Sequence, residues 1–160
     1  MAEEILQKRM EDSITEQYHL LMSPDLNGSG RLFGGRLLAW IDETAGIVGR
    51  RHSGKDVVTA AIDNLEFKAG AFRNDIILLI GHIVYTGRTS MEVRVDTYVE
   101  NSDGMRHPIN RAYVTMVAVD DSQRPAPVPQ LVLETEVQKA EWEGALKRKE
   151  LRKMRKREGF

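Results

Sequence analysis

The chain has 160 residues, of which 41% are hydrophobic and 29% are charged, and it contains no cysteine. This length predicts one domain that is large enough to bury a core. The composition excludes wholesale disorder, collagen and a membrane channel. The lack of cysteine excludes disulfides, thiolate metal sites, iron–sulfur clusters and a cysteine nucleophile. The longest apolar run, Ile76 to Ile80, is too short to span a bilayer, so we expect no membrane insertion.

The net charge of −1 conceals two regions of opposite sign. Residues 139–158 contain nine Lys or Arg and four Glu, a local charge of +5 that leaves about −6 for the rest of the chain. We therefore predict an acidic body followed by a basic tail. The first four residues lack the basic and apolar regions of a signal peptide, so we expect a cytoplasmic protein.

The predicted elements follow in an order typical of an α+β fold. Residues 16–22 predict a strand, and the turn-rich residues 23–30 end it. Residues 34–51 predict a helix, because apolar side chains recur at helical spacing. Alternating patterns then predict four strands, at residues 57–68, 75–85, 90–100 and 111–120. We expect an antiparallel sheet curled around the central helix, with its exposed edges paired to a second copy of the chain.

Two shorter features divide the chain further. The tight turn 86–89 predicts an antiparallel hairpin between its flanking strands. Three prolines between residues 124 and 129 rule out helix and central strand there, so they mark the boundary of the body. We predict a domain at residues 1–132 and a charged C-terminal helical tail at 133–160.

Three residues around the predicted helix are candidates for chemistry. Asp42 lies about two turns into the helix among small residues, where an unpaired buried carboxylate would be costly. The sequence leaves two roles open for Asp42, a functional carboxylate or a structural capping or ion-pair residue. Gly35 is near the helix start, where free N–H groups and the helix dipole favour negative charge. Asn27 precedes a glycine, which is also ordinary turn chemistry.

Other sites are not expected. The four histidines are scattered and no pair has metal-ligand spacing on a helix, so we predict no metal site. The glycine-rich residues 28–35 match neither the dinucleotide fingerprint nor the Walker motif. The basic tail interleaves Glu and lacks stacking aromatics, so we expect no nucleic-acid partner.

A longer pattern runs through these residues: Pro24-Asp25-x-Asn27-x-x-Gly30-x-x-Phe33-Gly34-Gly35-x-Leu37-Leu38-x-x-Ile41-Asp42-x-x-Ala45. It continues through Val57-Val58-Thr59, Phe67, Gly87-Arg88-Thr89-Ser90-Met91 and Val117-Ala118-Val119-Asp120. Taken in order, these segments resemble the signature of the hotdog-fold acyl-CoA thioester hydrolases, the cytosolic acyl-CoA thioesterase family. The resemblance covers about residues 14–130 and leaves out the tail.

The resemblance implies a hotdog fold, a homodimer that associates further into a trimer of dimers, and an acyl-CoA substrate. It implies that Asp42 is the catalytic carboxylate and Asn27 the second polar catalytic group. Arg88, Thr89 and Ser90 match the hairpin that lines the coenzyme A groove, and Thr59 falls in a matching segment that we also expect to contact the coenzyme.

The expected reaction needs an attacking group and donors for an oxyanion. Asp42 can act as general base or as nucleophile. The Gly35 N–H is a suitable oxyanion donor at a helix start, and the Asn27 amide can orient water or the carbonyl. We expect neither a metal nor a redox cofactor, and coenzyme A enters only as part of the substrate.

Two alternatives remain open. A hotdog dehydratase would resemble a His and carboxylate pair, but no His lies between Met22 and Arg51. A non-catalytic acyl-CoA-sensing regulator would call for a DNA-binding helix-turn-helix, and the stretch before Tyr18 leaves little room for one.

Overall fold

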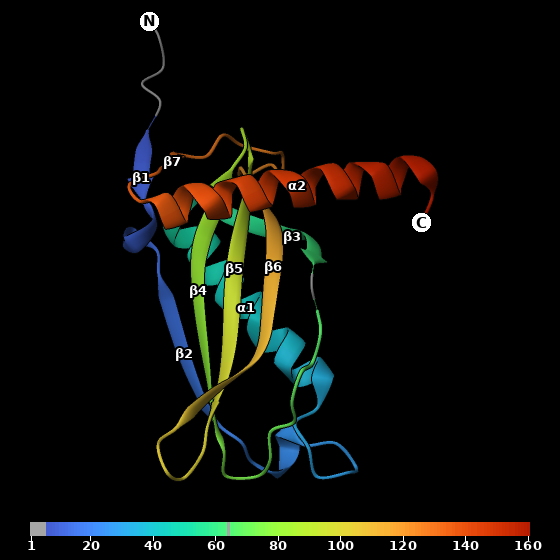
Figure 1. Ribbon diagram of the computed structural model, residues 1–160. Helices are drawn as coiled ribbons and strands as arrows, with labels where there is room; N and C mark the ends of the chain where they lie inside the picture. The colour runs from blue at the N-terminus through green and yellow to red at the C-terminus, as the bar shows by residue number, and fades with distance from the viewer. Residues whose placement is uncertain (1–5, 64) are drawn as a thin grey trace, which may run out of the picture.

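The structure is a computed structural model that describes residues 6–63 and 65–160. A five-stranded antiparallel sheet lies between two helices, α1 (Gly34–Ser53) and α2 (Glu136–Glu158) (Figure 1). The sheet has the strand order β2-β4-β5-β6-β3, and its strands are β2 (Thr15–Leu20), β3 (Asp56–Asp63), β4 (Ile76–Thr86), β5 (Ser90–Glu100) and β6 (Arg106–Val119). This arrangement confirms the expected α+β fold, in which an antiparallel sheet curls around a central helix.

The core fills the space between α1 and the inner face of the sheet. Four of the five residues of the predicted apolar stripe of α1 are buried there, since Leu37, Ile41, Ala45 and Val48 are at most 1% exposed, and the fifth, Leu38, is partly buried. Gly81 on β4 allows the closest approach, because a Cβ atom there would lie 3.0 Å from the side chains of Thr44 and Val48. α1 therefore packs tightly against β4.

Two strand boundaries differ from the prediction by five residues. β3 ends at Asp63, and the following segment leaves the sheet so that the ring of Phe67 lies against Gly34 at the start of α1. β6 begins at Arg106, five residues earlier than predicted. Pro108 is accommodated because it pairs with Tyr98 where the β5–β6 register shifts, and a bulge tolerates a missing N–H.

A second, parallel sheet was not predicted. It consists of β1 (Gln7–Arg9) and β7 (Gln130–Val132), two three-residue strands from opposite ends of the chain. The proline-rich segment before β7 is fixed to the β4–β5 hairpin, because the N–H of Val128 donates to the carbonyl of Arg88 at 3.0 Å. Two 3₁₀ turns, Met10–Asp12 and Ser23–Asp25, complete the fold.

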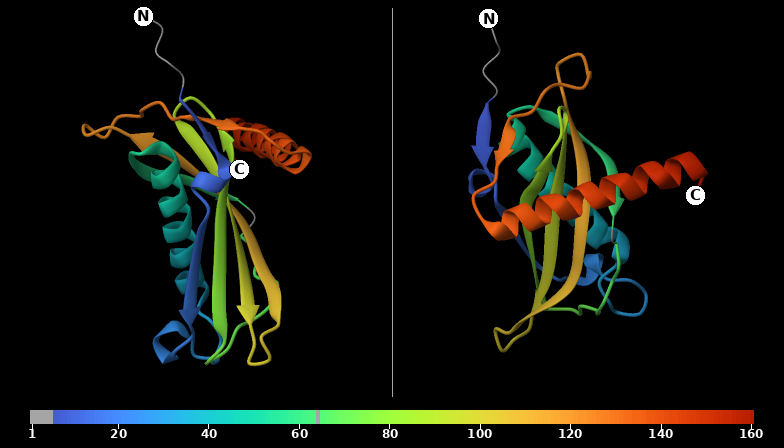
Figure 2. Two further views of the ribbon diagram at one scale, coloured as in Figure 1. Left: turned by 90° about the vertical axis from the view of Figure 1, so that its left-hand side faces the viewer. Right: turned by 45° about the horizontal axis from the view of Figure 1, so that its top comes forward.

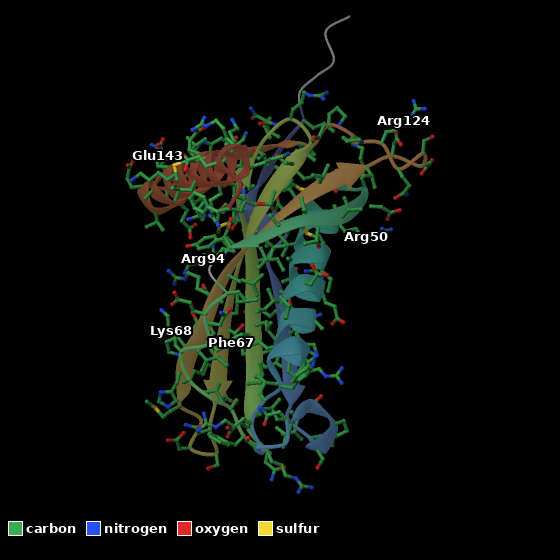
Figure 3. All side chains as sticks on the ribbon, turned by 90° about the vertical axis from the view of Figure 1, so that its right-hand side faces the viewer. Arg50, Phe67, Lys68, Arg94, Arg124 and Glu143 are labelled. Carbon is green, nitrogen blue, oxygen red and sulfur yellow. The ribbon has the colours of Figure 1, made fainter. Side chains whose placement is uncertain are left out.

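Helix α2 crosses the upper part of the outer face of the sheet (Figure 2). Its apolar contact is small: Ala145 is buried, and the ring of Trp142 packs on Tyr85 with centroids 4.5 Å apart. In Figure 3, Arg94 lies on the side of the sheet that α2 covers, whereas Arg50 lies on the side of α1. The basic tail expected from the sequence is thus a helix packed over the sheet.

Several ion pairs join α2 to the sheet. Glu141 bonds to Arg94 and lies 3.2 Å from the Nε2 atom of His82. Burial raises the pKa of Glu141, but the hydrogen bonds and charges of His82 and Arg94 outweigh burial and hold that pKa below its ordinary value. Deeper under the helix, Arg148 donates from Nε and Nη2 to the buried carboxylate of Glu92, at 3.1 and 2.6 Å. In the described residues, neither helix is long and apolar enough to cross a membrane.

His52, at the end of α1, makes stability depend on pH. Its side chain is fully buried, and its Nε2 atom lies 2.7 Å from the carbonyl oxygen of Pro129, so Nε2 carries the proton. Nδ1 is buried and has no hydrogen-bond partner among the described residues. Burial lowers the pKa of His52 below 6.5, although the Pro129 carbonyl opposes this. Below about pH 6.5 the unfolded chain therefore binds a proton that the folded chain excludes.

We expect the free energy of unfolding to fall as pH drops from about 7.5 to 5.5, by at most ~1.4 kcal/mol per pH unit for His52 below its unfolded pKa. Urea titrations at each pH measure this slope. His52→Gln should flatten the slope, whereas His107→Gln, at an exposed position, should leave it unchanged. If His52→Gln does not fold, an NMR titration of the wild-type ring tests the same point. A ring that titrates at or above pH 6.5 contradicts the prediction.

Candidate active site

Asp42 and Thr59 meet at one edge of the molecule. Asp42 lies in the middle of α1 and is half-buried, and Thr59 lies on the edge strand β3. The hydroxyl of Thr59 donates to Oδ1 of Asp42 at 2.6 Å. Among residues 6–63 and 65–160, the second carboxylate oxygen, Oδ2, has no hydrogen-bond partner, so this pair presents an oriented acceptor at the surface.

The start of α1 presents free donors. An α-helix leaves its first N–H groups without partners in the helix. Here the carbonyl of Phe33 accepts from Arg36 and Leu37, and Gly35 precedes both. A Cβ atom at Gly35 would lie 2.6 Å from the ring of Phe33, so a larger residue would displace that ring. The Gly35 N–H therefore stands at an exposed helix start, under an aromatic ring.

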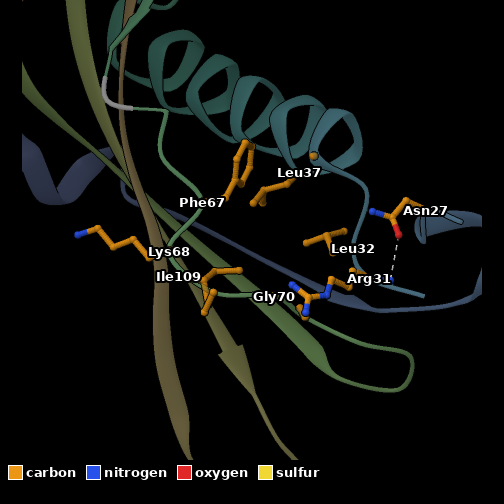
Figure 4. A pocket seen from close by; sticks show the side chains of 11 residues that line it. Asn27, Arg31, Leu32, Leu37, Phe67, Lys68, Gly70 and Ile109 are labelled. Carbon is orange, nitrogen blue, oxygen red and sulfur yellow. Dashed lines mark hydrogen bonds between the residues drawn. The ribbon is translucent and has the colours of Figure 1, made fainter. Parts of the chain in front are cut away.

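Asn27 organises the loop before α1. Its Oδ1 atom accepts from the backbone N–H groups of Ser29 and Arg31, at 2.9 and 3.2 Å. This is an Asx turn, the ordinary role considered above. The bonds use only the oxygen, and in Figure 4 the side-chain nitrogen is turned toward a pocket.

That pocket has a volume of about 330 Å³ and lies between the start of α1, the segment after β3 and strand β6 (Figure 4). Its lining combines apolar and polar surface in similar amounts, and it consists of Asn27, Arg31, Leu32, Gly34, Leu37, Phe67, Lys68, Ala69, Gly70, Ala71 and Ile109. Neither Asp42 nor Thr59 lines it. Asp42 is seven residues beyond Gly35, which corresponds to about 10 Å along the helix. A single chain thus does not bring Asn27 and Asp42 to one pocket.

The β4–β5 hairpin carries the three residues expected to contact coenzyme A. Arg88 lines a pocket of about 790 Å³ together with Ser53 and Lys55, at the end of α1. Thr89 accepts from the N–H of Ala118 through its carbonyl. Ser90 lines a smaller cleft of about 240 Å³ under α2. Arg88 and Ser90 therefore line different pockets.

Lys55 is a residue that the sequence analysis missed. It follows Gly54, which ends α1 in a left-handed conformation with φ 68°, and its Nζ atom donates to the carbonyl of Pro127 at 2.8 Å. This places a second cation in the pocket of Arg88. No sequence motif includes Lys55, because the pocket joins segments that lie more than 70 residues apart. Among the described residues, no three His, Asp or Glu side chains are grouped to hold a metal.

Comparisons with known proteins identify the family. The model of the thioesterase superfamily matches residues 29–105. The uncharacterized acyl-CoA thioester hydrolase YkhA of Bacillus subtilis is 36% identical over 134 residues, which are 83% of this chain and 78% of that protein. The cytosolic acyl coenzyme A thioester hydrolase of Rattus norvegicus is 36% identical over 129 residues, or 78% of this chain. The chain spans only 34% of that rat protein.

Two solved structures superimpose over nearly the whole chain. An apo-hexameric acyl-CoA thioesterase is 44% identical with a TM-score of 0.90, over 94% of this chain and 97% of that one. The Staphylococcus aureus acyl-CoA hydrolase, solved with butyryl coenzyme A, coenzyme A and coenzyme A disulfide, is 33% identical with a TM-score of 0.88, over 96% and 94%. Together with the Bacillus relative, these matches show that the chain belongs to the thioesterase superfamily, among its hotdog-fold acyl-CoA thioester hydrolases.

Proposed function

We propose that the protein hydrolyses acyl-CoA thioesters to coenzyme A and a carboxylic acid, with Asp42 as the catalytic carboxylate. The observation that carries the proposal is the carboxylate of Asp42, half-buried on α1 and oriented by the Thr59 hydroxyl at 2.6 Å. A carboxylate held in this way can accept a proton from water or attack a carbonyl carbon itself. We assign to Thr59 the role of orienting Asp42.

The proposed steps balance with water as the only co-reactant. Water, deprotonated by Asp42, or Asp42 itself attacks the thioester carbonyl. The negative charge that develops on the carbonyl oxygen is stabilised by the Gly35 N–H at the start of α1 of a second copy of the chain, because Gly35 of the same chain is about 10 Å from Asp42 along the helix. The C–S bond then breaks, and the coenzyme A thiolate takes up the proton. If Asp42 is the nucleophile, the thiolate leaves first, water hydrolyses the resulting anhydride in a second step, and that water supplies the proton that the thiolate takes up.

The S. aureus hydrolase supports this choice of residues. Its solved variants replace an aspartate, an asparagine and a threonine by alanine. Each of these is numbered one higher in that protein than Asp42, Asn27 and Thr59 are here, and the two chains superimpose over nearly their full lengths. The three residue types and their spacing are therefore the same in both chains.

We propose that the coenzyme lies along α1, with its diphosphate near Arg88 and Lys55. Ser53, which lines their pocket, is 11 residues beyond Asp42, or about 16 Å along the helix. The pantetheine arm has about 13 bonds between sulfur and phosphorus, which equals roughly four extended residues, or ~15 Å. A thioester at Asp42 thus reaches the pocket with its diphosphate. At about 790 Å³, the pocket is within the range of nucleotide-sized ligand sites.

We propose a homodimer formed through β3, assembled further as a trimer of dimers. β3 is an edge strand, and Val58, Thr59 and Ala60 on it are exposed and carry no charge. Unprotected edges of this kind pair readily with another strand. The solved thioesterase that is 44% identical is hexameric. For the location we propose the cytoplasm, since the rat relative is named cytosolic.

Release of free thiol from acyl-CoA tests the proposed activity. We expect turnover of short-, medium- or long-chain acyl-CoA in the presence of a metal chelator, with a preference for chain length that identifies the substrate class. An acyl-CoA-sensing protein would bind these thioesters without releasing thiol. Binding without turnover at any chain length would thus contradict the proposal.

A further inference from the structure

The cleft that Ser90 lines is cationic and lies apart from Asp42 and from the pocket of Arg88. It is enclosed by the β4–β5 hairpin, strand β6 and the C-terminal half of α2, and it has a volume of about 240 Å³. We call it the α2 cleft, and its lining residues are Tyr85, Ser90, Met91, Glu92, Thr115, Lys149, Arg152, Lys153 and Lys156. Four of these nine side chains are cations and only one is an anion. The family motifs end near residue 130 and therefore give no reason for these cations.

The cations converge because of helical spacing. Lys149, Lys153 and Lys156 are separated by four and three residues, so they lie on one face of α2 with neighbouring Cβ atoms about 5–6 Å apart. Lys153 pairs only loosely with Glu150, at 3.7 Å between two exposed side chains. Lys149 lies 3.3 Å from the hydroxyl of Tyr85. Lys156 has no ion-pair partner among residues 6–63 and 65–160.

The single carboxylate in the α2 cleft does not cancel this charge. Glu92 has a side chain only 2% exposed, and Arg148 binds both of its oxygens. Arg152 lies 3.5 Å from it and 2.6 Å from Asp63. The guanidinium groups of Arg148 and Arg152 thus neutralise Glu92, and Lys149, Lys153 and Lys156 border the cleft as further cations. The cleft as a whole favours an anion.

The walls of the α2 cleft also contain hydroxyl groups that could hydrogen-bond to an anion. Thr115 lines the cleft, and its Oγ1 atom is buried with no hydrogen-bond partner in the described chain, so it is free to donate to an oxygen. Ser90 adds a second hydroxyl, at the first residue of β5. Most of the wall is apolar, and it is formed by Tyr85, Met91 and the aliphatic stems of the lysines. A tetrahedral oxyanion with several acceptor oxygens matches three ammonium groups and two hydroxyls.

We propose that the α2 cleft binds a phosphate group of a small organic molecule, with Lys149, Lys153 and Lys156 as the cationic contacts. The cleft is smaller than the 300–1,000 Å³ of typical sites for whole ligands. It therefore holds the phosphate and a small adjoining part, which lies against Tyr85. The phosphate comes from one of two sources, the coenzyme of the substrate or a separate phosphate-bearing effector. Only the first source, the coenzyme, rests on the proposed acyl-CoA hydrolase function.

Trp142 provides a direct readout of binding. Its ring packs on Tyr85, which lines the cleft, whereas the other tryptophan, Trp40, stacks on His19 with ring centroids 4.0 Å apart. Titration with inorganic pyrophosphate at constant ionic strength should change the fluorescence of the wild-type protein. The change should be absent in Trp142→Phe. Constant ionic strength keeps general screening the same at every point.

A pair of matched double variants tests the assignment. Lys153→Gln/Lys156→Gln removes two charges inside the cleft, and Lys139→Gln/Lys147→Gln removes two exposed charges from the same helix, outside the cleft. We expect the first pair to weaken pyrophosphate binding at least about tenfold and the second to change it less than about twofold. Equal losses in the two would mean diffuse attraction to α2 and would overturn the proposal. So would a wild-type protein that does not bind pyrophosphate.

Kinetics with two substrates separate the sources of the phosphate. If it belongs to coenzyme A, Lys153→Gln/Lys156→Gln should raise KM for acyl-CoA, leave kcat unchanged and leave KM for the matching acyl-pantetheine unchanged. If the phosphate belongs to an effector, Lys153→Gln/Lys156→Gln should lose pyrophosphate binding but keep the wild-type KM for both substrates. Saturating coenzyme A should then not displace pyrophosphate from the wild-type protein. A protein that binds pyrophosphate but hydrolyses neither substrate contradicts the proposed activity and leaves the phosphate site standing.

Discussion

Replacing Asp42 with alanine is expected to lower kcat for thioester hydrolysis by roughly 10³-fold while the fold is retained. A positioned general base contributes about 10²–10⁴-fold to a rate, and a nucleophile whose covalent step is lost costs at least as much. The site is half-buried and borders the edge strand β3, so the truncation leaves no deep cavity. Thiol-release kinetics give kcat, and circular dichroism with thermal unfolding checks the fold.

Two further variants make this result specific. Asp42→Asn keeps the shape of the side chain and its oxygen facing Thr59, but it removes the charge, so kcat should fall nearly as far as in Asp42→Ala. Glu43→Ala removes the neighbouring carboxylate, which is exposed and points about 100° away around the helix, and should leave kcat within about twofold. An Asp42 variant that retains near-normal kcat would remove this carboxylate from the mechanism.

Much of the fold was predictable because its signals are local. The period-two pattern of β5 matched the predicted residues 90–100 without any shift, since alternate side chains meet the core and the outer face. The helical stripe of α1 was equally clear. β1 and β7 were missed because three residues carry no periodicity, and their pairing joins Gln7 to Gln130 across most of the chain.

The position of α2 was not predictable from its pattern. Its inward face contains Glu141, Arg148 and Arg152, residue types that ordinarily indicate a solvated surface. They become inward-facing only because the sheet offers partners of opposite charge, such as Glu92, which lies 56 residues before Arg148. Composition alone therefore predicted that residues 133–160 form a separate charged tail, whereas the contacts show a helix packed over β4 and β5.

The candidate site also contains residues that motifs predicted and residues that only the structure reveals. Motif resemblance named Asp42, Asn27 and Thr59 as separate residues, but only the structure brings Thr59 to the carboxylate of Asp42. Lys55 and the lysines of the α2 cleft belong to no motif, because their pockets form where segments distant in sequence meet. Asn27 stays apart from Asp42 within the chain, which leaves the proposed site incomplete in a single copy.

We expect two inactive variants, Asp42→Ala and Asn27→Ala, to restore activity when they are unfolded together and refolded as a mixture. The start of α1 and Asp42 are separated by about 10 Å along a rigid helix, so in the structure of one chain Asn27 does not reach Asp42. A second chain related by a two-fold axis at β3 would run its helix in the opposite direction. Its Asn27 loop and helix start would then lie beside the first chain's Asp42.

The amount of recovery is set by the symmetry of the dimer. A mixed dimer would contain one doubly mutated site and one intact site, and random 1:1 pairing makes half of the dimers mixed, so activity should return to roughly a quarter of the wild-type level. Each variant refolded alone serves as the control and should stay inactive. Mass spectrometry under native conditions verifies that mixed dimers form. If they form without recovery, Asn27 and Asp42 act on the same chain, and the loop before α1 must then move toward its own helix when substrate binds.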